Sequence, residues 1–290
     1  MQKSIITIIL LFLLAACSQG GAPTAQETLA PSLPPTATAP AEVAVVNGEG
    51  ILLESYTANL RLFQEAQAQT GTLLATEDVR QTVIESLVDR LLLAQAARAA
   101  GFTADDALLD ERIAAVVQQA GSQEAFDAWL AEHGLSAEIF REELRLELEA
   151  AHMVAEISSG VPATAEQVEA RQVLLPDLFS AERLLSQLDS GTSFETVVQN
   201  NDPRRLGTLG WFPRGYLLQR EVEEAAFALQ PGDYSRVVES ELGFHLIQVL
   251  ARDANRPLSS QALLALQTKA VQDWLSQQRA DSAIEIRLPD

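Results

Sequence analysis

Apolar side chains recur at every third or fourth position over much of the chain between residues 54 and 158. The clearest stripe lies in segment 77–100 and consists of Val79, Val83, Leu87 and Leu91. Because an α-helix turns once in about 3.6 residues, this spacing places the four side chains on one helix face. Ser122 and Ser136 precede further stripes, and serine is a favoured residue for capping the first backbone amides of a helix. The pattern predicts a series of helices, the last of which ends near Ser158.

The pattern changes after residue 160 to short apolar runs separated by turn residues. Thr164 and Gln167 have the spacing of a capping box, which predicts a helix start. Beyond them we predict strands and helices in the order β-α-α-β-α-β-β, over 170–175, 180–188, 193–199, 208–212, 221–229, 234–238 and 244–250. Such an order is typical of a mostly antiparallel sheet of four strands with helices packed against it.

Both ends of the folded region carry strand patterns. Val43–Val46 forms a short apolar run that is followed by the turn residues Asn47 and Gly48. Near the carboxyl end, Ile284, Ile286 and Leu288 alternate with charged residues, so one face of this strand is predicted to be buried. A helical stripe precedes it and consists of Leu263, Leu266, Ala270 and Trp274.

Several sequence motifs in the second region resemble those of the parvulin family of peptidyl-prolyl isomerases. They are Gly-Thr-Leu-Gly-Trp-Phe-Pro-Arg-Gly at 207–215, Glu-Glu-Ala-Ala-Phe-Ala-Leu at 223–229, Pro-Gly-Asp at 231–233 and Gly-Phe-His-Leu-Ile-Gln-Val at 243–249. The match covers about 80 residues, Gln172–Val249. The motif Val-Val-Asn-Gly-Glu at 45–49, near the start of the folded region, resembles the start of the chaperone domain in SurA-type and PrsA-type foldases.

The resemblance implies an α+β protein in which a parvulin-like domain, 164–253, is inserted in a mainly helical chaperone domain. That helical domain would comprise 43–160 and be completed by 258–290. In the resembled foldases the carboxyl-terminal segment packs back onto the amino-terminal domain. We therefore expect Val43–Val46 to lie near Ile284–Leu288.

The resemblance also implies where the active site lies. It assigns His245 to the histidine of the closing strand, Asp202 to a position held by cysteine or aspartate, and Gln172 to the first strand. It assigns the pocket for the proline ring to Phe212, Leu218, Val222 and Leu209, although the two leucines are equally plausible core residues. Since rotation about a peptide bond breaks no covalent bond, we expect neither a metal nor a cofactor.

The chain departs from the family pattern at this site. Gln172 stands where the family usually has histidine, and it cannot be protonated near neutral pH as histidine can. Val222 stands where phenylalanine is usual, and the loop from Asp202 to Gly207 is shorter than usual. Two interpretations remain open: a working isomerase, or a degenerate module that only binds extended polypeptide. In the second, His245 would be a hydrogen-bonded histidine of the sheet without catalytic effect.

The charge of the chain excludes some partners. It carries 40 acidic and 20 basic side chains, for a formal net charge of −20. Nucleic-acid binding needs a basic face that neutralises phosphates, and anionic lipid attracts basic segments. We therefore expect no nucleic-acid partner and no electrostatic docking on lipid.

The amino terminus predicts export and a lipid anchor. A basic Lys3 and an apolar run over 4–14 are typical of a signal peptide, predicted over 1–16. The sequence Leu-Ala-Ala-Cys ending at Cys17 resembles the bacterial lipobox, which implies lipidation of Cys17. An ordinary secretory signal with a chance cysteine is the alternative. Segment 17–42 is rich in Pro, Thr and Ala and is predicted to be a disordered linker.

Together these features predict a membrane-anchored, extracytoplasmic peptidyl-prolyl cis-trans isomerase that assists the folding of exported proteins. Its partners would be unfolded or nascent exported polypeptides with X-Pro bonds. One alternative is a chaperone holdase whose parvulin module is catalytically weak. Another is a lipoprotein that scaffolds a surface complex and has no unfolded client.

Overall fold

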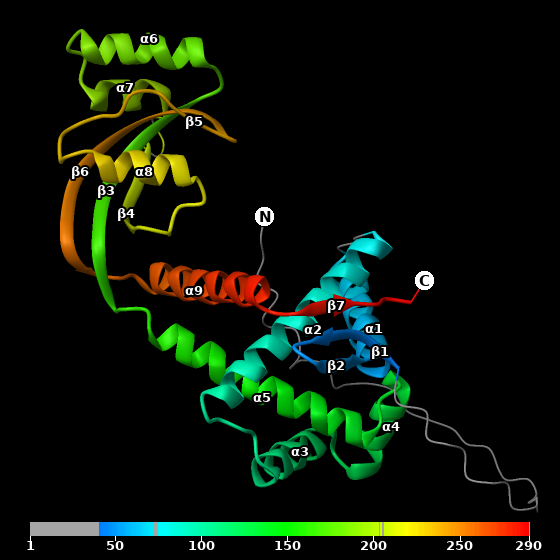
Figure 1. Ribbon diagram of the computed structural model, residues 1–290. Coiled ribbons are helices and arrows are strands. Elements are labelled where there is room, and N and C mark those ends of the chain that lie inside the picture. Colours follow the sequence, from blue (N-terminus) through cyan, green and yellow to red (C-terminus); the bar gives the residue numbers. More distant parts are fainter. Residues whose placement is uncertain (1–40, 72–74, 203, 205, 290) are drawn as a thin grey trace, which may run out of the picture. The chain divides into compact units, whose positions relative to one another are not determined.

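The computed structural model describes residues 41–71, 75–202, 204 and 206–289 (Figure 1). The predicted signal peptide, Cys17 and nearly all of the predicted linker lie outside the described residues. The chain divides into two compact units. Among the described residues, those up to Val154 together with those from Leu275 onwards are called the helical unit, and those of Ala155–Trp274 are called the sheet unit.

The helical unit contains the helices that the apolar stripes predicted. They are α1 (Leu53–Thr70), α2 (Thr76–Ala99), α3 (Asp106–Ala120), α4 (Gln123–His133) and most of α5 (Ala137–Ser159). The Ser122 hydroxyl accepts the Ala125 N–H at 3.2 Å, and the Ser136 hydroxyl accepts the Ile139 N–H at 3.1 Å. Both serines therefore cap the helices that follow them, as their sequence positions predicted.

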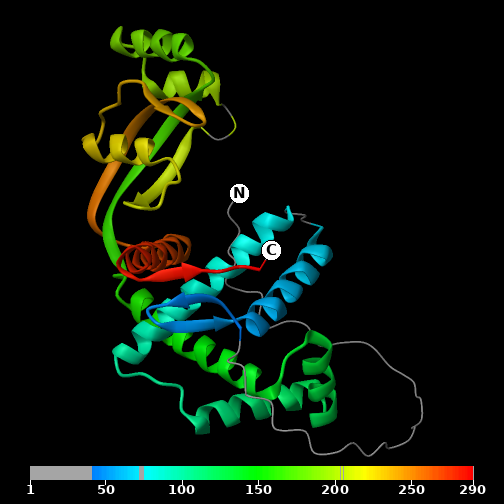
Figure 2. The ribbon, with the colours of Figure 1, turned by 45° about the vertical axis from the view of Figure 1, so that its right-hand side comes forward.

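A three-stranded sheet in the order β2-β1-β7 joins the two ends of the folded region (Figure 2). Its strands are β1 (Glu42–Val46), β2 (Glu49–Leu52) and β7 (Ile284–Ile286). The expected proximity of the two chain ends is confirmed, because Ala44 lies opposite Ile286 and Val46 lies opposite Ile284. Buried side chains of β1 join the stripe of α2 in one apolar cluster, against which Leu275 at the end of α9 (Ser260–Asp281) also packs.

The sheet unit is built on four strands in the order β4-β3-β6-β5, and all three pairings are antiparallel. The strands are β3 (Thr164–Leu175), β4 (Thr208–Pro213), β5 (Val238–Ser240) and β6 (Gly243–Pro257). The helices are α6 (Leu178–Asp189), α7 (Phe194–Asn201) and α8 (Arg220–Ala228). The α+β class and the four-stranded sheet agree with the sequence prediction.

Two details of the sheet differ from the prediction. Thr164–Gln167 begins the long strand β3 and does not cap a helix, because its backbone pairs with the far end of β6. Segment 234–238 is mostly not a strand. Tyr234 makes only an isolated bridge to Gln248, and β5 begins at Val238.

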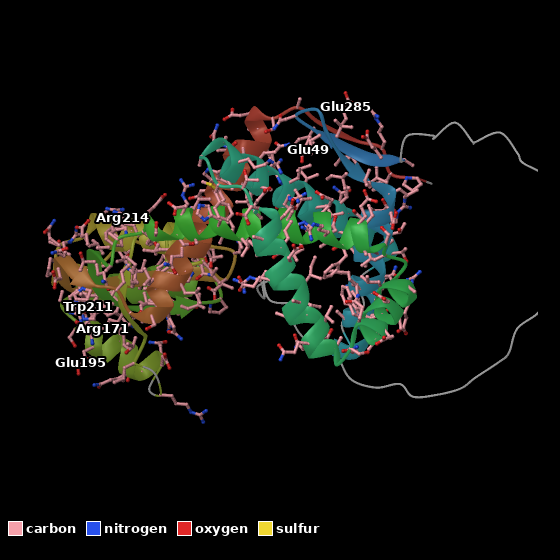
Figure 3. All side chains as sticks on the ribbon, turned by 90° about the horizontal axis from the view of Figure 1, so that it is seen from below. Glu49, Arg171, Glu195, Trp211, Arg214 and Glu285 are labelled. Atoms are coloured by element: carbon pink, nitrogen blue, oxygen red, sulfur yellow. The ribbon has the colours of Figure 1, made fainter. Side chains whose placement is uncertain are left out.

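Helices cover both faces of the sheet. Residues of α6 and α7 pack with Val173, Leu175 and Leu246 on one face, while α8 packs with Ile247 and Val249 on the other (Figure 1). Successive side chains of a strand point to opposite faces, so neighbours along β3 separate. Figure 3 labels Arg171 in the same part of the molecule as Glu195 of α7. The guanidinium of Arg171 lies 5.5 Å from the ring centre of Phe194 at the start of α7, so Arg171 is on the α7 side. The next residue, Gln172, therefore faces the α8 side.

Candidate functional site

Three polar side chains on the α8 side of the sheet form a hydrogen-bonded chain. His245 is 1% exposed, and its Nδ1 lies 2.8 Å from Oε1 of Gln172. Its other ring nitrogen, Nε2, lies 2.6 Å from Oγ of Ser240, which also accepts the Leu242 N–H at 3.1 Å. Strand register explains the meeting, since His245 pairs with Leu174 of β3 and with Val238 of β5.

Ser240 is a site residue that sequence reasoning did not identify. It precedes His245 by five residues, and the tight turn between β5 and β6 brings the two side chains together. Ser240 could have been found from the sequence by predicting a β-hairpin that turns just before Gly243, because such a hairpin places residues 240 and 245 on neighbouring strands.

The environment of His245 favours the neutral imidazole. Burial lowers the pKa of His245 below its ordinary value of 6.5, and the Glu221 carboxylate opposes this change only in part. A neutral imidazole has one N–H donor and one acceptor nitrogen. The two hydrogen bonds of His245 therefore have opposite directions at neutral pH.

A hollow of about 350 Å³ opens beside Gln172. Its lining consists of Gln172, Val173, Leu174, Asn201, Asp202, Gly207 and Thr208. The structure thus brings Asp202 and Gln172, which are 30 positions apart in the chain (202 − 172), to one hollow.

Asp202 lies at the end of α7 and closes the loop that bounds the hollow. Its carboxylate accepts the Gly207 N–H at 3.2 Å, and its carbonyl accepts the Leu206 N–H at 2.9 Å. The Gly207 carbonyl in turn accepts the Gln172 N–H at 2.8 Å, which ties the loop to β3. The loop is therefore held at both of its ends.

Three of the four apolar candidates belong to or pack against the core beneath α8, and the fourth is exposed to solvent. Phe212 is 0% exposed and Val222 is 2% exposed, so both belong to the core beneath α8, and Leu209 packs against the same cluster. Phe212 can support a pocket but has no surface for a ligand. Leu218 is 90% exposed, so it is not a core residue, and its contact with the proline ring stays a prediction.

Leu217, which was not predicted, packs against this cluster instead. The buried carboxylate of Glu223, a residue that is 8% exposed, explains why Leu217 and not Leu218 packs against the cluster. It accepts the backbone N–H groups of Gly215, Tyr216 and Leu217 at 2.7, 3.0 and 3.1 Å. These bonds fix the loop before α8 with Leu217 turned inward and Leu218 turned to solvent.

Comparison with known proteins identifies two family profiles that match this chain. The profile described as a SurA-like N-terminal domain matches residues 1–154, and the profile described as a PPIC-type PPIASE domain matches residues 152–251. Along the described part of the chain, no helix is both long and apolar enough to cross a membrane.

Relatives match over different lengths. The foldase protein PrsA of Caldanaerobacter subterraneus is 26% identical over 71% of this chain and 72% of its own length. The chaperone SurA of Burkholderia thailandensis is 37% identical over 36% of this chain, and the chain spans only 25% of that protein. A crystal structure of the peptidylprolyl isomerase PrsA from Bacillus cereus aligns with 16% identity and a TM-score of 0.45, covering 84% of this chain and 87% of that one.

The first profile spans more than half of the 290 residues, and the second coincides with β3, β4, β5 and most of β6. The chain therefore belongs to the SurA-like N-terminal domain family and carries, after that domain, a peptidyl-prolyl cis-trans isomerase domain of the PPIC type.

Proposed function

We propose that this protein is a membrane-anchored, extracytoplasmic foldase that isomerises X-Pro bonds in unfolded exported polypeptides. His245, Asp202 and Gln172 form the proposed catalytic site, and the apolar cluster that contains Val222 and Leu209 supports the proline ring. The observation that carries the proposal concerns Gln172, which is hydrogen-bonded to His245 and lines the same hollow as Asp202.

The chemistry of prolyl isomerisation suits such a site. The barrier to rotation about a peptide bond is about 18–20 kcal/mol, and it arises from amide resonance that twisting removes. A protein accelerates the rotation when it binds the twisted amide more tightly than the planar one. A polar group at the wall of a hollow, beside an apolar surface for the ring, can make that distinction without forming or breaking a covalent bond.

The purified full chain is expected to accelerate cis-to-trans exchange in a tetrapeptide with Leu or Phe before proline. Uncatalysed exchange takes tens to hundreds of seconds, roughly, so a stopped-flow assay at low temperature resolves the catalysed phase. Leu217→Ala should lower kcat/KM about tenfold by removing an apolar contact worth about 1.4 kcal/mol. Leu264→Ala is the control, because this leucine of the same unit is 65% exposed. No acceleration by the wild type would contradict the proposal.

A pure holdase is the second candidate, and two observations favour it. Gln172 replaces the usual histidine of the family. Exposed large apolar side chains, which an unfolded client could contact, are concentrated in the sheet unit: among described residues they are Leu174, Leu178, Phe179, Leu206, Leu218, Leu242, Leu250 and Leu264 there, and Ile286 in the helical unit. The holdase predicts suppressed aggregation of an unfolded client without any change in proline exchange. A gain of exchange activity in Gln172→His would show that the site is otherwise formed.

The proposed anchor is tested through Cys17, the only cysteine of the chain. The wild-type protein should incorporate labelled fatty acid and sediment with membranes. Cys17→Ser should lose the label and appear in the soluble extracytoplasmic fraction, because no acylated thiol remains to hold it. Ser18→Ala serves as the neighbouring control and should behave as the wild type. Unchanged sedimentation of Cys17→Ser would reject the lipid anchor.

A further inference from the structure

We infer that Gln172 meets the substrate as a hydrogen-bond donor, with its amide nitrogen turned into the hollow by His245 and Ser240. The inference rests on the proposed isomerase function and specifies how its site recognises the X-Pro bond. Gln172 is then the group that touches substrate, while His245 and Ser240 are positioning residues.

The donor and the acceptor of each hydrogen bond between Ser240, His245 and Gln172 follow from the geometry. The Leu242 N–H points at Oγ of Ser240, so this oxygen acts as an acceptor on that side. Its single hydrogen is available for Nε2 of His245 at 2.6 Å. A neutral imidazole that accepts at Nε2 carries its proton on Nδ1, which lies 2.8 Å from Oε1 of Gln172. The imidazole therefore donates to the amide oxygen.

The amide nitrogen of Gln172 is then the end that remains for a ligand. Among the described residues it has no hydrogen-bond acceptor, and the buried side-chain nitrogen and oxygen atoms without a partner are Oη of Tyr56 and Nε of Arg252. Nε2 of Gln172 is not one of these fully buried atoms, so it is accessible, and Gln172 is one of the residues that line the hollow. Two N–H groups are available there.

A donor matches the chemistry of the X-Pro bond. The bond offers a carbonyl oxygen and a nitrogen without hydrogen, so it can accept hydrogen bonds but cannot donate them. In the planar form the nitrogen lone pair takes part in resonance, and twisting releases it. A donor aimed at the nitrogen therefore interacts more strongly with the twisted form, which raises kcat.

Gln172→Glu tests the donor directly. The variant keeps an oxygen for Nδ1 of His245 but replaces the NH₂ group with an acceptor oxygen. We expect kcat to fall about tenfold or more with a smaller change in KM, while unfolding of the sheet unit is little changed. Gln230→Glu adds the same charge at an exposed position of the same unit and should keep the wild-type rate.

Protonation should restore the donor. The ratio of the Gln172→Glu rate to the wild-type rate should rise as the pH falls towards the carboxyl pKa, because a protonated carboxyl has an O–H. Asp202 and Glu221 are present in both proteins, whereas His245 contacts residue 172, and a carboxylate there favours the charged imidazole. The protonation of His245 is therefore followed by its imidazole nitrogen-15 signals in the same titration, and the ratio is compared over the pH range in which those signals agree between the two proteins. A flat ratio, or a rate of Gln172→Glu equal to that of Gln230→Glu, overturns the inference.

Ser240 is tested by a pair of variants. Ser240→Ala removes the hydroxyl that directs the imidazole proton and should lower kcat, whereas Ser240→Thr retains a hydroxyl and should recover much of the rate. If Ser240→Ala and Ser240→Thr lose the rate equally, the orienting role is contradicted.

A spectroscopic readout separates this inference from the proposed function. In nitrogen-15 spectra of the full chain, a proline tetrapeptide should shift the side-chain NH₂ signal of Gln172. The NH₂ of Gln248, which bonds to the Gly232 carbonyl at 3.1 Å, should stay in place. An unmoved Gln172 signal overturns the inference even if the protein is active. An inactive wild type whose Gln172 signal shifts leaves the donor role supported and rejects the isomerase proposal alone.

Discussion

Gly207→Ala is expected to destabilise the sheet unit by about 2–5 kcal/mol and to abolish prolyl isomerisation. The added Cβ would lie 1.9 Å from the Gln172 carbonyl oxygen and 3.0 Å from its carbon. Gly207 also has a φ of +62°, which costs a side chain about 1–2 kcal/mol. Overpacking against a backbone that cannot move freely adds about 1–3 kcal/mol. Hydrogen exchange of the β3 and β6 amides measures the loss.

The site depends on the same contact. The Gly207 carbonyl accepts the Gln172 N–H at 2.8 Å, so any movement of the loop away from β3 displaces the residue that joins His245 to the hollow. Activity should therefore fall even in molecules that remain folded. Residual activity measured well below the unfolding temperature distinguishes this local effect from global unfolding.

Gly210→Ala is the matched control. Gly210 lies on β4 with a φ of +73°, but a Cβ there would meet nothing within 4 Å. This variant has the backbone strain without the collision and should lose only about 1–2 kcal/mol. Equal losses in the two variants would show that the approach of Gly207 to β3 does not decide the effect.

Glu223→Ala should cost about 2–4 kcal/mol in the sheet unit and raise the KM for a proline peptide about tenfold. The substitution removes the acceptor of three backbone N–H groups, and a hydrogen bond to a charged group contributes about 1.5–3 kcal/mol. The freed amides of Gly215, Tyr216 and Leu217 can recover part of this loss by binding water. Leu217 is then no longer held against the apolar cluster, which should weaken binding of the proline ring.

Glu224→Ala is the control on the neighbouring residue of α8. Glu224 pairs with Arg220 at 2.6 Å, and the two side chains are 59% and 82% exposed. Exposed ion pairs of this kind contribute about 0–1 kcal/mol. Chemical denaturation measures the free energy of unfolding of both variants, and peptide kinetics measure their KM. If Glu223→Ala behaves like Glu224→Ala, the carboxylate does not position the loop.

Local patterns were sufficient for the helices of the helical unit. The stripe of Val79, Val83, Leu87 and Leu91 predicted α2, because burial of one face is set by the 3.6-residue repeat. The hydroxyls of Ser122 and Ser136 cap their helices, because a cap involves only residues within one turn. These interactions need no knowledge of the remainder of the chain.

Local patterns cannot distinguish two neighbouring residues, or two kinds of element, that share the same local sequence pattern. Leu217 and Leu218 are identical side chains in one loop, and only the bonds from Glu223 turn one inward and the other outward. The capping-box spacing at Thr164–Gln167 is equally compatible with a strand. Pairing with β6 outweighs a cap there, because an entire ladder of backbone hydrogen bonds is gained.

The sequence by itself determined the class of the protein, most of its order of elements and the segments that carry Gln172, Asp202 and His245, because periodicity, caps and family motifs are local. Only the tertiary structure decided which of these residues meet. Gln172 and His245 are 73 positions apart, and their contact at 2.8 Å depends on the β3–β6 register. A slip of one residue would turn His245 to the α6–α7 face and break its bonds to Gln172 and Ser240.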